Sequence, residues 1–240
     1  MTLKDVAKVS RKVIPVKKCG AVIVAAGSAS RMGGIDKVMA PLGAEPMLLR
    51  TVKAFEETAV IREIVIVTRQ DLILPVSNLC AGMTKVRAVI AGGSSRQESV
   101  ALGLAALSGD MELAAVHDGA RPLISRELID KTVRAAHSFG AAAPAIAVKD
   151  TIKVAGSGFV VSTPERDTLR AVQTPQVFDA ELLKGALEKA KQDGAAVTDD
   201  CSAVERLGMK IRLVEGEERN LKVTTPLDLK IAEILLEEDK

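Results

Sequence analysis

Short apolar runs that suit buried β-strands alternate along the chain with stretches whose apolar residues have helical spacing. This alternation is typical of a mostly parallel sheet covered by helices on both faces. The sequence therefore predicts an α/β, doubly wound, Rossmann-like fold. Strands are expected at 19–25, 63–68, 86–91, 113–117, 141–148 and 210–214, and helices at 47–58, 97–107, 127–139, 180–192, 201–207 and 226–236.

The alternation breaks near residue 150. Two short β-like runs at 150–154 and 158–162 flank Ala155-Gly156-Ser157, where glycine suits a tight turn. We therefore expect a β-hairpin arm at about 150–175, inserted into a single domain that spans 19–240. Residues 1–18 carry six basic side chains against one acidic one and are interpreted as an N-terminal extension, with a targeting peptide as the alternative.

Composition limits the classes of partner. The net charge is +2 and 2% of the residues are aromatic, with no Trp or Tyr, so a nucleic-acid surface built on base stacking is not expected. No apolar run approaches the roughly 20 residues of a membrane-spanning helix. The three widely spaced cysteines and two histidines suit neither a disulfide framework nor a metal cluster, and they favour a reduced, cytoplasmic protein.

The first candidate site is the loop that leaves the strand at 19–25. Its small residues, Ala25-Ala26-Gly27, allow backbone N–H groups to approach an anion closely, and Arg31 and Lys37 follow with positive charge. Open α/β sheets bind ligands at the carboxyl ends of their strands. We therefore interpret the loop as a polyphosphate site, although Gly-x-x-x-x-Gly-Lys-Ser/Thr and Gly-x-Gly-x-x-Gly are both absent.

Two further strand ends carry candidate residues. Gly92-Gly93 precedes a helix start, where free N–H groups favour an anion, although the serines that follow are equally well explained as N-caps. Asp118 suits a ribose hydroxyl or a hydrated Mg2+, with a simple loop acid as the alternative. Arg121 suits a phosphate, whereas His117 is interpreted as a hydrogen-bonded core residue.

The last third of the chain admits structural explanations. Thr198-Asp199-Asp200 opens a helix, and an N-capping role is favoured for Thr198 and Asp199. From its position alone, Lys222 is best explained as a solvated lysine.

Taken together, these segments resemble the 2-C-methyl-D-erythritol 4-phosphate cytidylyltransferase family, from Cys19 to the last helix. The resemblance implies a nucleotidyltransferase-type fold whose hairpin arm reaches across a homodimer. The segments that carry it are Ala25-Ala26-Gly27 with Arg31-Met32, Gly92-Gly93 with Arg96 and Ser99-Val100, His117-Asp118 with Ala120-Arg121-Pro122, Asp150-Thr151-Ile152-Lys153, Gln173-Thr174-Pro175-Gln176, Thr198-Asp199-Asp200 and Asn220-Leu221-Lys222-Val223-Thr224.

The resemblance also implies a role for each matching residue. Loop residues hold the triphosphate, cytosine and ribose of CTP: Ala25, Ala26, Gly27, Gly92, Gly93, Ser99, Asp118 and Gly119. Polar side chains hold the phosphate of the methylerythritol phosphate acceptor, two of them (Thr151 and Arg166) in the partner's site: Arg121, Thr151, Arg166, Thr174 and Lys222. Three cations are implied as catalytic: Arg31, Lys37 and Lys222. Asp118 is also the candidate contact for Mg2+, direct or indirect.

The implied reaction is in-line attack of the acceptor phosphate on the α-phosphorus of CTP, with release of pyrophosphate. Because the nucleophile is already an anion, no general base is required. Catalysis then rests on positioning and on positive charge from the three cations and Mg2+.

Two departures from the family pattern bear on these expectations. Asp36 stands where the family commonly has proline, and its pairing with Lys37 would change the aim of that lysine. Gly119 replaces an alanine, a mild steric change for a backbone contact. A ribitol 5-phosphate cytidylyltransferase and a non-catalytic nucleotide-binding regulator remain the alternatives. They are distinguished by the acceptor pocket and by the release of pyrophosphate.

Overall fold

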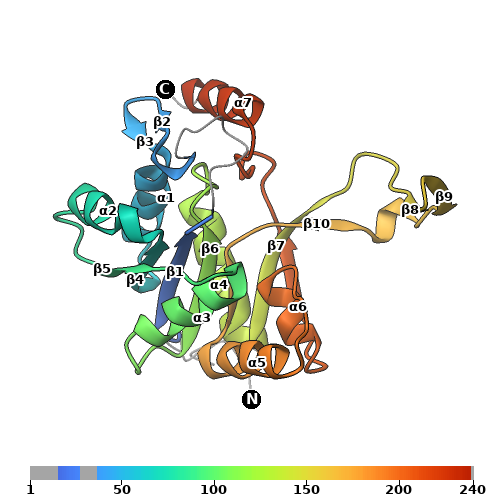
Figure 1. Cartoon of the computed structure of the whole chain (residues 1–240), viewed down its shortest axis with the longest axis horizontal. Helices are drawn as coiled ribbons and strands as arrows, with labels where there is room; N and C mark the ends of the chain where they lie inside the picture. The colour runs from blue at the N-terminus through green and yellow to red at the C-terminus, as the bar shows by residue number, and fades with distance from the viewer. Residues whose placement is uncertain (1–15, 28–36, 239–240) are drawn as a thin grey trace, which may run out of the picture.

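The computed structural model describes residues 16–27 and 37–238, and for Lys37 the backbone alone. In this part of the chain, a central eight-stranded sheet lies between two layers of helices (Figure 1). Two short strand pairs lie outside it, β2 (Pro41–Leu42) with β3 (Glu45–Pro46) and β8 (Val154–Gly156) with β9 (Phe159–Ser162). The strands of the sheet are β1 (Cys19–Ala25), β4 (Ile61–Thr68), β5 (Val86–Ala91), β6 (Leu113–Asp118), β7 (Ala141–Ala147), β10 (Arg170–Val172), β11 (Gln176–Asp179) and β12 (Arg212–Glu215).

The strand order places β11 between β6 and β7 and β12 beyond β7, with β1, β4 and β5 following β6 on the other side. Both edges of β7 are paired, since Ala142 pairs with Val177 of β11 and with Arg212 of β12. β10 and β11 run antiparallel to their neighbours, and the other strands are parallel. This mostly parallel, doubly wound sheet confirms the predicted fold class.

Helices cover both faces of the sheet because β1 has apolar side chains on both. Ile23 packs into one buried cluster with Leu48 and Phe55, and Val22 packs into another with Val100 and Leu183. The first face is covered by α1 (Met47–Glu56), α2 (Ile73–Leu79) and α4 (Arg126–Phe139), and the second by α3 (Arg96–Ala106), α5 (Ala180–Gln192) and α6 (Asp200–Glu205). Single 3-10 turns are η1 (Lys37–Met39), η2 (Gln70–Leu72) and η3 (Arg166–Thr168).

The last helix, α7 (Pro226–Glu237), packs beside β2 and β3 at the top of Figure 1. Its start is fixed by a capping box, in which Thr225 and Asp228 satisfy each other's backbone N–H groups. This cap also fixes the end of the loop that carries Lys222. Within residues 16–27 and 37–238, no helix combines the length and apolar character needed to cross a membrane.

The arm is present, but its turn lies further along the chain than predicted. Ser157 and Gly158 form the turn with φ values of 51° and 84°, so β8 ends at Gly156 instead of turning there. A two-residue hairpin turn of type I′ needs positive φ at both central positions, and Ser157-Gly158 supplies them. Figure 1 shows the hairpin extending well to the side of the sheet.

Candidate active site

The loops that follow β1 and β5 lie against each other at the carboxyl edge of the sheet. A Cβ at Gly92 would lie 2.5 Å from the Ala26 Cβ and 2.8 Å from Ser99 Oγ, so this contact requires glycine. Ser99 Oγ accepts a hydrogen bond from the Gly93 N–H (3.1 Å) and donates one to the Ser95 carbonyl (2.8 Å). The predicted residues Gly92, Gly93 and Ser99 thus form one hydrogen-bonded turn beside Ala26.

The start of α3 is fixed by its own side chains. Ser95 is the N-cap, and its hydroxyl accepts the Glu98 N–H at 3.1 Å, which confirms the capping alternative for this serine. The Glu98 carboxylate accepts hydrogen bonds from the N–H and the hydroxyl of Ser94, both at 2.7 Å. The turn after β5 is therefore held at both ends.

Asp118, at the end of β6, is surrounded by positive charge. Its carboxylate lies 2.8 Å from Lys222 Nζ, 3.6 Å from Arg96 Nε and 3.9 Å from Arg121 Nε. Burial alone would raise the pKa of Asp118, but the charges of Lys222 and Arg96 outweigh it and lower the pKa to about 2. Asp118 is therefore an anion that gathers three cations at one point.

Arg96 joins Asp118 to a second buried carboxylate. Its NH2 group lies 2.7 Å from Asp200 Oδ2, and the Asp200 side chain is 1% exposed. Burial raises the pKa of Asp200, although Arg96 opposes that rise. The predicted site residues omitted both members of this pair, which are 104 positions apart. Asp199 is the N-cap of α6, as predicted.

A cavity of about 510 Å³ opens where these loops meet. A Cβ at Gly27 would meet no atom of the described residues within 4 Å, so packing against this part of the chain does not require glycine there. Gly119 does not line the cavity itself but packs against Ala25, which does: a Cβ at Gly119 would lie 3.2 Å from the Cβ of Ala25. The cavity is lined by Val24, Ala25, Ala26, Gly27, Val38, Gly93, Ser94, Ser95, Arg96, Ser99, Asp118, Ala120 and Lys222.

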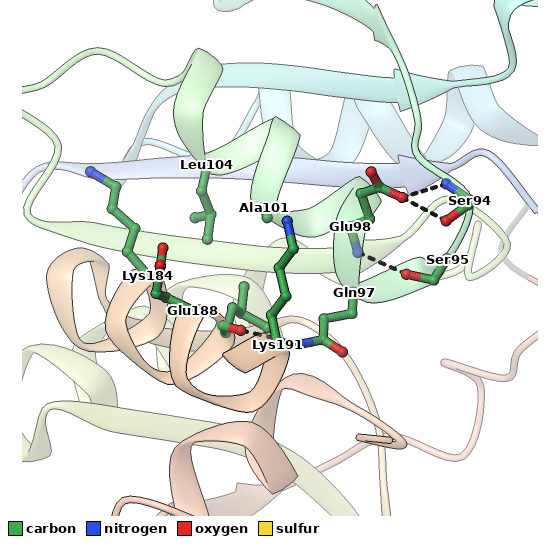
Figure 2. Close-up of a pocket in the computed structure, with 10 residues that line it drawn as sticks. Ser94, Ser95, Gln97, Glu98, Ala101, Leu104, Lys184, Glu188 and Lys191 are labelled. Atoms are coloured by element: carbon green, nitrogen blue, oxygen red, sulfur yellow. Dashed lines mark hydrogen bonds between the residues drawn. The ribbon is translucent and has the colours of Figure 1, made fainter. Parts of the chain in front are cut away.

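A larger cavity, of about 630 Å³, lies between α3 and α5. It shares Ser94 and Ser95 with the first cavity, and Figure 2 shows Lys184 and Lys191 extending from α5 toward α3. None of the predicted site residues that the structure describes lines it. We therefore take the smaller cavity as the candidate site, because several predicted site residues line it, whereas none of those described lines the larger one.

Thr174 lies beneath Asp118, where β10 leads into β11. Its Oγ1 is 3.2 Å from the Asp118 backbone N and 3.0 Å from His117 Nδ1. Asn220 Nδ2 donates to the Thr174 carbonyl at 2.9 Å. The loop that carries Lys222 is thereby tied to the end of β6.

Arg121 is held at the same junction but keeps one donor unused. Its NH1 group donates to the Asn220 carbonyl at 2.6 Å, while its buried Nε has no hydrogen-bond partner among the described residues. Burial lowers the pKa of Arg121, and the charge of Asp118 opposes this change. A buried donor without a partner costs free energy, so this position suits an anionic ligand.

Two predicted acceptor residues lie elsewhere, on the arm. Thr151 and Arg166 are exposed and do not line the cavity of their own chain. Arg166 NH1 donates to the Lys149 carbonyl at 3.2 Å. Arg31 and Asp36 lie outside the described residues, as does the side chain of Lys37. Their expected contacts therefore stay predictions.

The buried His117 should make the protein acid-sensitive. Burial lowers the pKa of His117 from 6.5 to about 3, so the unfolded chain takes up this proton first as the pH falls. The stabilisation is complete above pH 6.5 and is lost as the pH falls toward 3. We expect about 2 kcal/mol of the unfolding free energy to be lost between pH 7 and pH 5 through this group.

Urea unfolding at a series of pH values measures this loss. His117→Phe keeps an aromatic ring against Phe55, whose centroid lies 4.9 Å from that of His117, but cannot take up the proton. Variant and parent share the same carboxylates, so the pH dependence that these groups contribute cancels when the two unfolding free energies are subtracted. A difference that does not change between pH 7 and pH 5 would contradict the assignment.

The fold and the site can be compared with known proteins. A family model described as 2-C-methyl-D-erythritol 4-phosphate cytidylyltransferase matches residues 19–238. A relative with that name from Desulforamulus reducens is 45% identical over 225 residues, covering 90% of this chain and 94% of its own. Another, from Caldanaerobacter subterraneus subsp. tengcongensis, is 43% identical over 221 residues, covering 90% and 97%.

A solved structure gives the same result. The crystal structure of the 4-diphosphocytidyl-2C-methyl-D-erythritol synthase from Anaerococcus prevotii is similar to this chain with a TM-score of 0.84 and 33% identity. The similarity covers 92% of this chain and 96% of that one. The family model and this structure thus each match most of the chain.

Proposed function

Because the chain belongs to the 2-C-methyl-D-erythritol 4-phosphate cytidylyltransferase family, we propose that the cavity of about 510 Å³ is its catalytic site. The chain is a nucleotidyltransferase. It transfers the cytidylyl group of CTP to 2-C-methyl-D-erythritol 4-phosphate in the non-mevalonate route to isoprenoid precursors, giving 4-diphosphocytidyl-2-C-methyl-D-erythritol and pyrophosphate. The observation that carries the site assignment is the meeting of Arg96, Arg121 and Lys222 around Asp118 at the carboxyl ends of the strands.

CTP occupies the part of the cavity between the loops after β1, β5 and β6. The backbone of Ala25, Ala26 and Gly27, which lines the cavity, cradles the triphosphate. The cytosine lies against the turn after β5, made by Gly92, Gly93 and Ser99. The ribose meets Asp118 and Gly119. We assign Arg31 and Lys37 to the same triphosphate site from the sequence, since the structure describes neither side chain.

The acceptor phosphate lies on the opposite side of Asp118, near Arg121. Support comes from Arg121 Nε, the buried donor that has no partner among the described residues. Thr151 and Arg166 of a partner arm complete this subsite. Thr174 borders the subsite, but its hydroxyl is already engaged with Asp118 and His117.

Lys222 connects the two subsites. In the structure it is bound to Asp118, and its side chain is 43% exposed, so the ammonium group is free to swing toward a phosphate. An acceptor phosphate oxygen attacks the α-phosphorus of CTP in line, and pyrophosphate leaves. Lys222, Arg31 and Lys37 offset the negative charge that builds up on the α-phosphate, and no general base is needed.

The site fits Mg2+ held mainly by the triphosphate. Among the described residues, no three His, Cys, Asp or Glu side chains come together to hold a metal ion. Mg2+ commonly keeps several waters and uses one or two carboxylates plus substrate phosphates, and Asp118 supplies one carboxylate here. Because three cations already surround Asp118, we propose an indirect contact through a metal-bound water. When bound, Mg2+ neutralises phosphate charge.

The arm supports a homodimer. Phe159, Val160 and Val161 on β9 are 78%, 62% and 69% exposed, an apolar surface that suits a partner. An arm that extends from its own sheet brings Thr151 and Arg166 to the cavity of a second copy. We place the enzyme in the cytoplasm, in keeping with the buried, unpaired cysteines Cys19, Cys80 and Cys201.

Release of pyrophosphate tests the acceptor assignment. With CTP and Mg2+, 2-C-methyl-D-erythritol 4-phosphate should give a kcat/KM at least about tenfold higher than ribitol 5-phosphate, because the acceptor pocket must distinguish a branched tetritol from a linear pentitol. A preference for ribitol 5-phosphate would assign the chain to that reaction instead. Binding of CTP without turnover of either acceptor would favour the non-catalytic regulator.

A further inference from the structure

Asn220 is a fully buried polar residue in the loop that carries Lys222, residues 216–224. Its side-chain Nδ2 donates hydrogen bonds to the Thr174 carbonyl at 2.9 Å and to Gln173 Oε1 at 3.3 Å. Its backbone carbonyl accepts a hydrogen bond from Arg121 NH1 at 2.6 Å. This one residue therefore ties the loop both to Arg121 and to the junction of β10 with β11.

The orientation of both side-chain amides follows from the carbonyls they face. A carbonyl oxygen can only accept, so the Asn220 atom that faces the Thr174 carbonyl is the amide nitrogen. Gln173 Nε2 likewise lies 2.7 Å from the Glu217 carbonyl, which leaves Gln173 Oε1 to accept the Glu217 N–H at 3.3 Å and the Asn220 amide. The loop passes so close to Gln173 that a Cβ at Gly216 would lie 2.6 Å from Oε1.

A second anchor follows directly after Lys222. Val223 is fully buried, and its N–H donates to the Ala120 carbonyl at 2.9 Å. The backbone of Lys222 is thus held on both sides, by Asn220 and by Val223, while its side chain is 43% exposed and reaches Asp118 at 2.8 Å. The ammonium group therefore moves about a fixed point of the backbone.

We propose that Asn220 is a positioning residue that couples Arg121 to Lys222 by fixing the loop between them. We take the roles of those two side chains from the proposed function, on which this inference rests. Asn220 does not line the cavity, so it acts on the reaction only through the loop. With the loop fixed, the Lys222 ammonium can leave Asp118 for a phosphate near Arg121 without a shift of the backbone.

A double-mutant cycle with Lys222 tests this coupling. Asn220→Ala removes both hydrogen bonds of the amide and keeps the backbone carbonyl that Arg121 contacts. We expect kcat to fall about 10- to 100-fold, because a displaced loop misplaces the ammonium group, while the KM for CTP stays within about twofold of the parent. In a Lys222→Ala background, the same substitution should change kcat by less than about threefold.

A merely structural role gives a different pattern. Asn220→Ala would then lower kcat by the same factor in both backgrounds, or would raise the KM for CTP along with it, and either result overturns the proposal. Asn220→Ser leaves less empty space and places its hydroxyl too far back to reach the Thr174 carbonyl, so it replaces the alanine variant if that one does not fold. The matched control is Lys131→Ala, which removes an exposed tie to the Glu215 carbonyl and should leave kcat within about twofold of the parent.

Trace labelling with acetic anhydride gives a readout that needs no turnover. An ammonium group held against Asp118 is shielded from the reagent, so in Asn220→Ala the acetylation of Lys222 should rise about threefold relative to that of Lys184, measured in the same protein by mass spectrometry. An unchanged ratio would show that Asn220 does not position Lys222. If the parent transferred cytidylyl groups to neither acceptor, the proposed function would fail, and this ratio would still decide the role of Asn220.

Discussion

Replacing Lys222 with alanine should lower kcat about 100- to 1,000-fold, the loss expected when one charge-stabilising group is removed from a reacting centre. Lys222 lines the cavity and approaches Asp118 at 2.8 Å, and in the proposed site its ammonium group would contact both phosphates. Asp118 would keep Arg96 and Arg121 at 3.6 and 3.9 Å, and the carboxylate would not be left as an unpaired buried charge. The variant should therefore fold and still bind CTP.

Steady-state kinetics and CTP binding together measure this effect. The matched control is Lys184→Ala, which removes an exposed lysine paired with Glu181 on α5 and should leave kcat within twofold of the parent. If Lys222→Ala also stays within twofold, the proposed role in charge stabilisation is wrong. If it loses CTP binding together with turnover, the lysine serves binding instead of the reaction step.

Two inactive variants should restore each other's activity when they share a dimer. Arg166→Ala alone should lower kcat/KM for the acceptor about 100-fold, because a charged contact to the phosphate is lost. In a mixed dimer with Lys222→Ala, one cavity carries both defects and the other carries neither. Random assembly makes half of the dimers mixed, so co-expression should restore about a quarter of the parent activity.

The control for this experiment uses two residues of the same cavity. Lys222→Ala co-expressed with Arg121→Ala should restore nothing, since each cavity of the mixed dimer then lacks one of its own groups. Equal recovery in both pairings would point to mixing artefacts. No recovery with Arg166→Ala would show that the arm serves its own chain, contrary to the proposed exchange of arms.

The parts of the fold that could be predicted are those with a local signal. The strand at 19–25 was predicted with the bounds that β1 has, because its apolar run ends at small loop residues. The sequence does not predict β11, because Gln176-Val177-Phe178-Asp179 has only two adjacent apolar residues and shows no strand-like alternation. Its antiparallel place between β6 and β7 is a tertiary contact that no local pattern encodes.

The same limit applies to the site. Asp118 and Gly92 could be proposed because each follows a strand, and the carboxyl ends of parallel strands meet at one edge. The ion pair of Arg96 with Asp200 and the hydrogen bond of His117 with Thr174 join residues 104 and 57 positions apart. Periodicity and spacing describe neighbours in the sequence, so only the folded chain reveals these two pairs.

The place of β11 has a consequence for the order in which the sheet is completed during synthesis. β6 and β7 follow each other in the order of strands along the chain, but in the sheet β11 lies between them, and β11 begins 29 positions after β7 ends.

 In chain order, β7 ends at Ala147, the whole arm follows, and only then does β11 begin at Gln176. A nascent chain released after β7 would therefore hold a sheet with an open slot between β6 and β7. β11 is synthesised after the arm, so the whole arm must leave the ribosome before β11 can pair between β6 and β7. The sheet of the subunit can therefore be completed only once the arm has emerged.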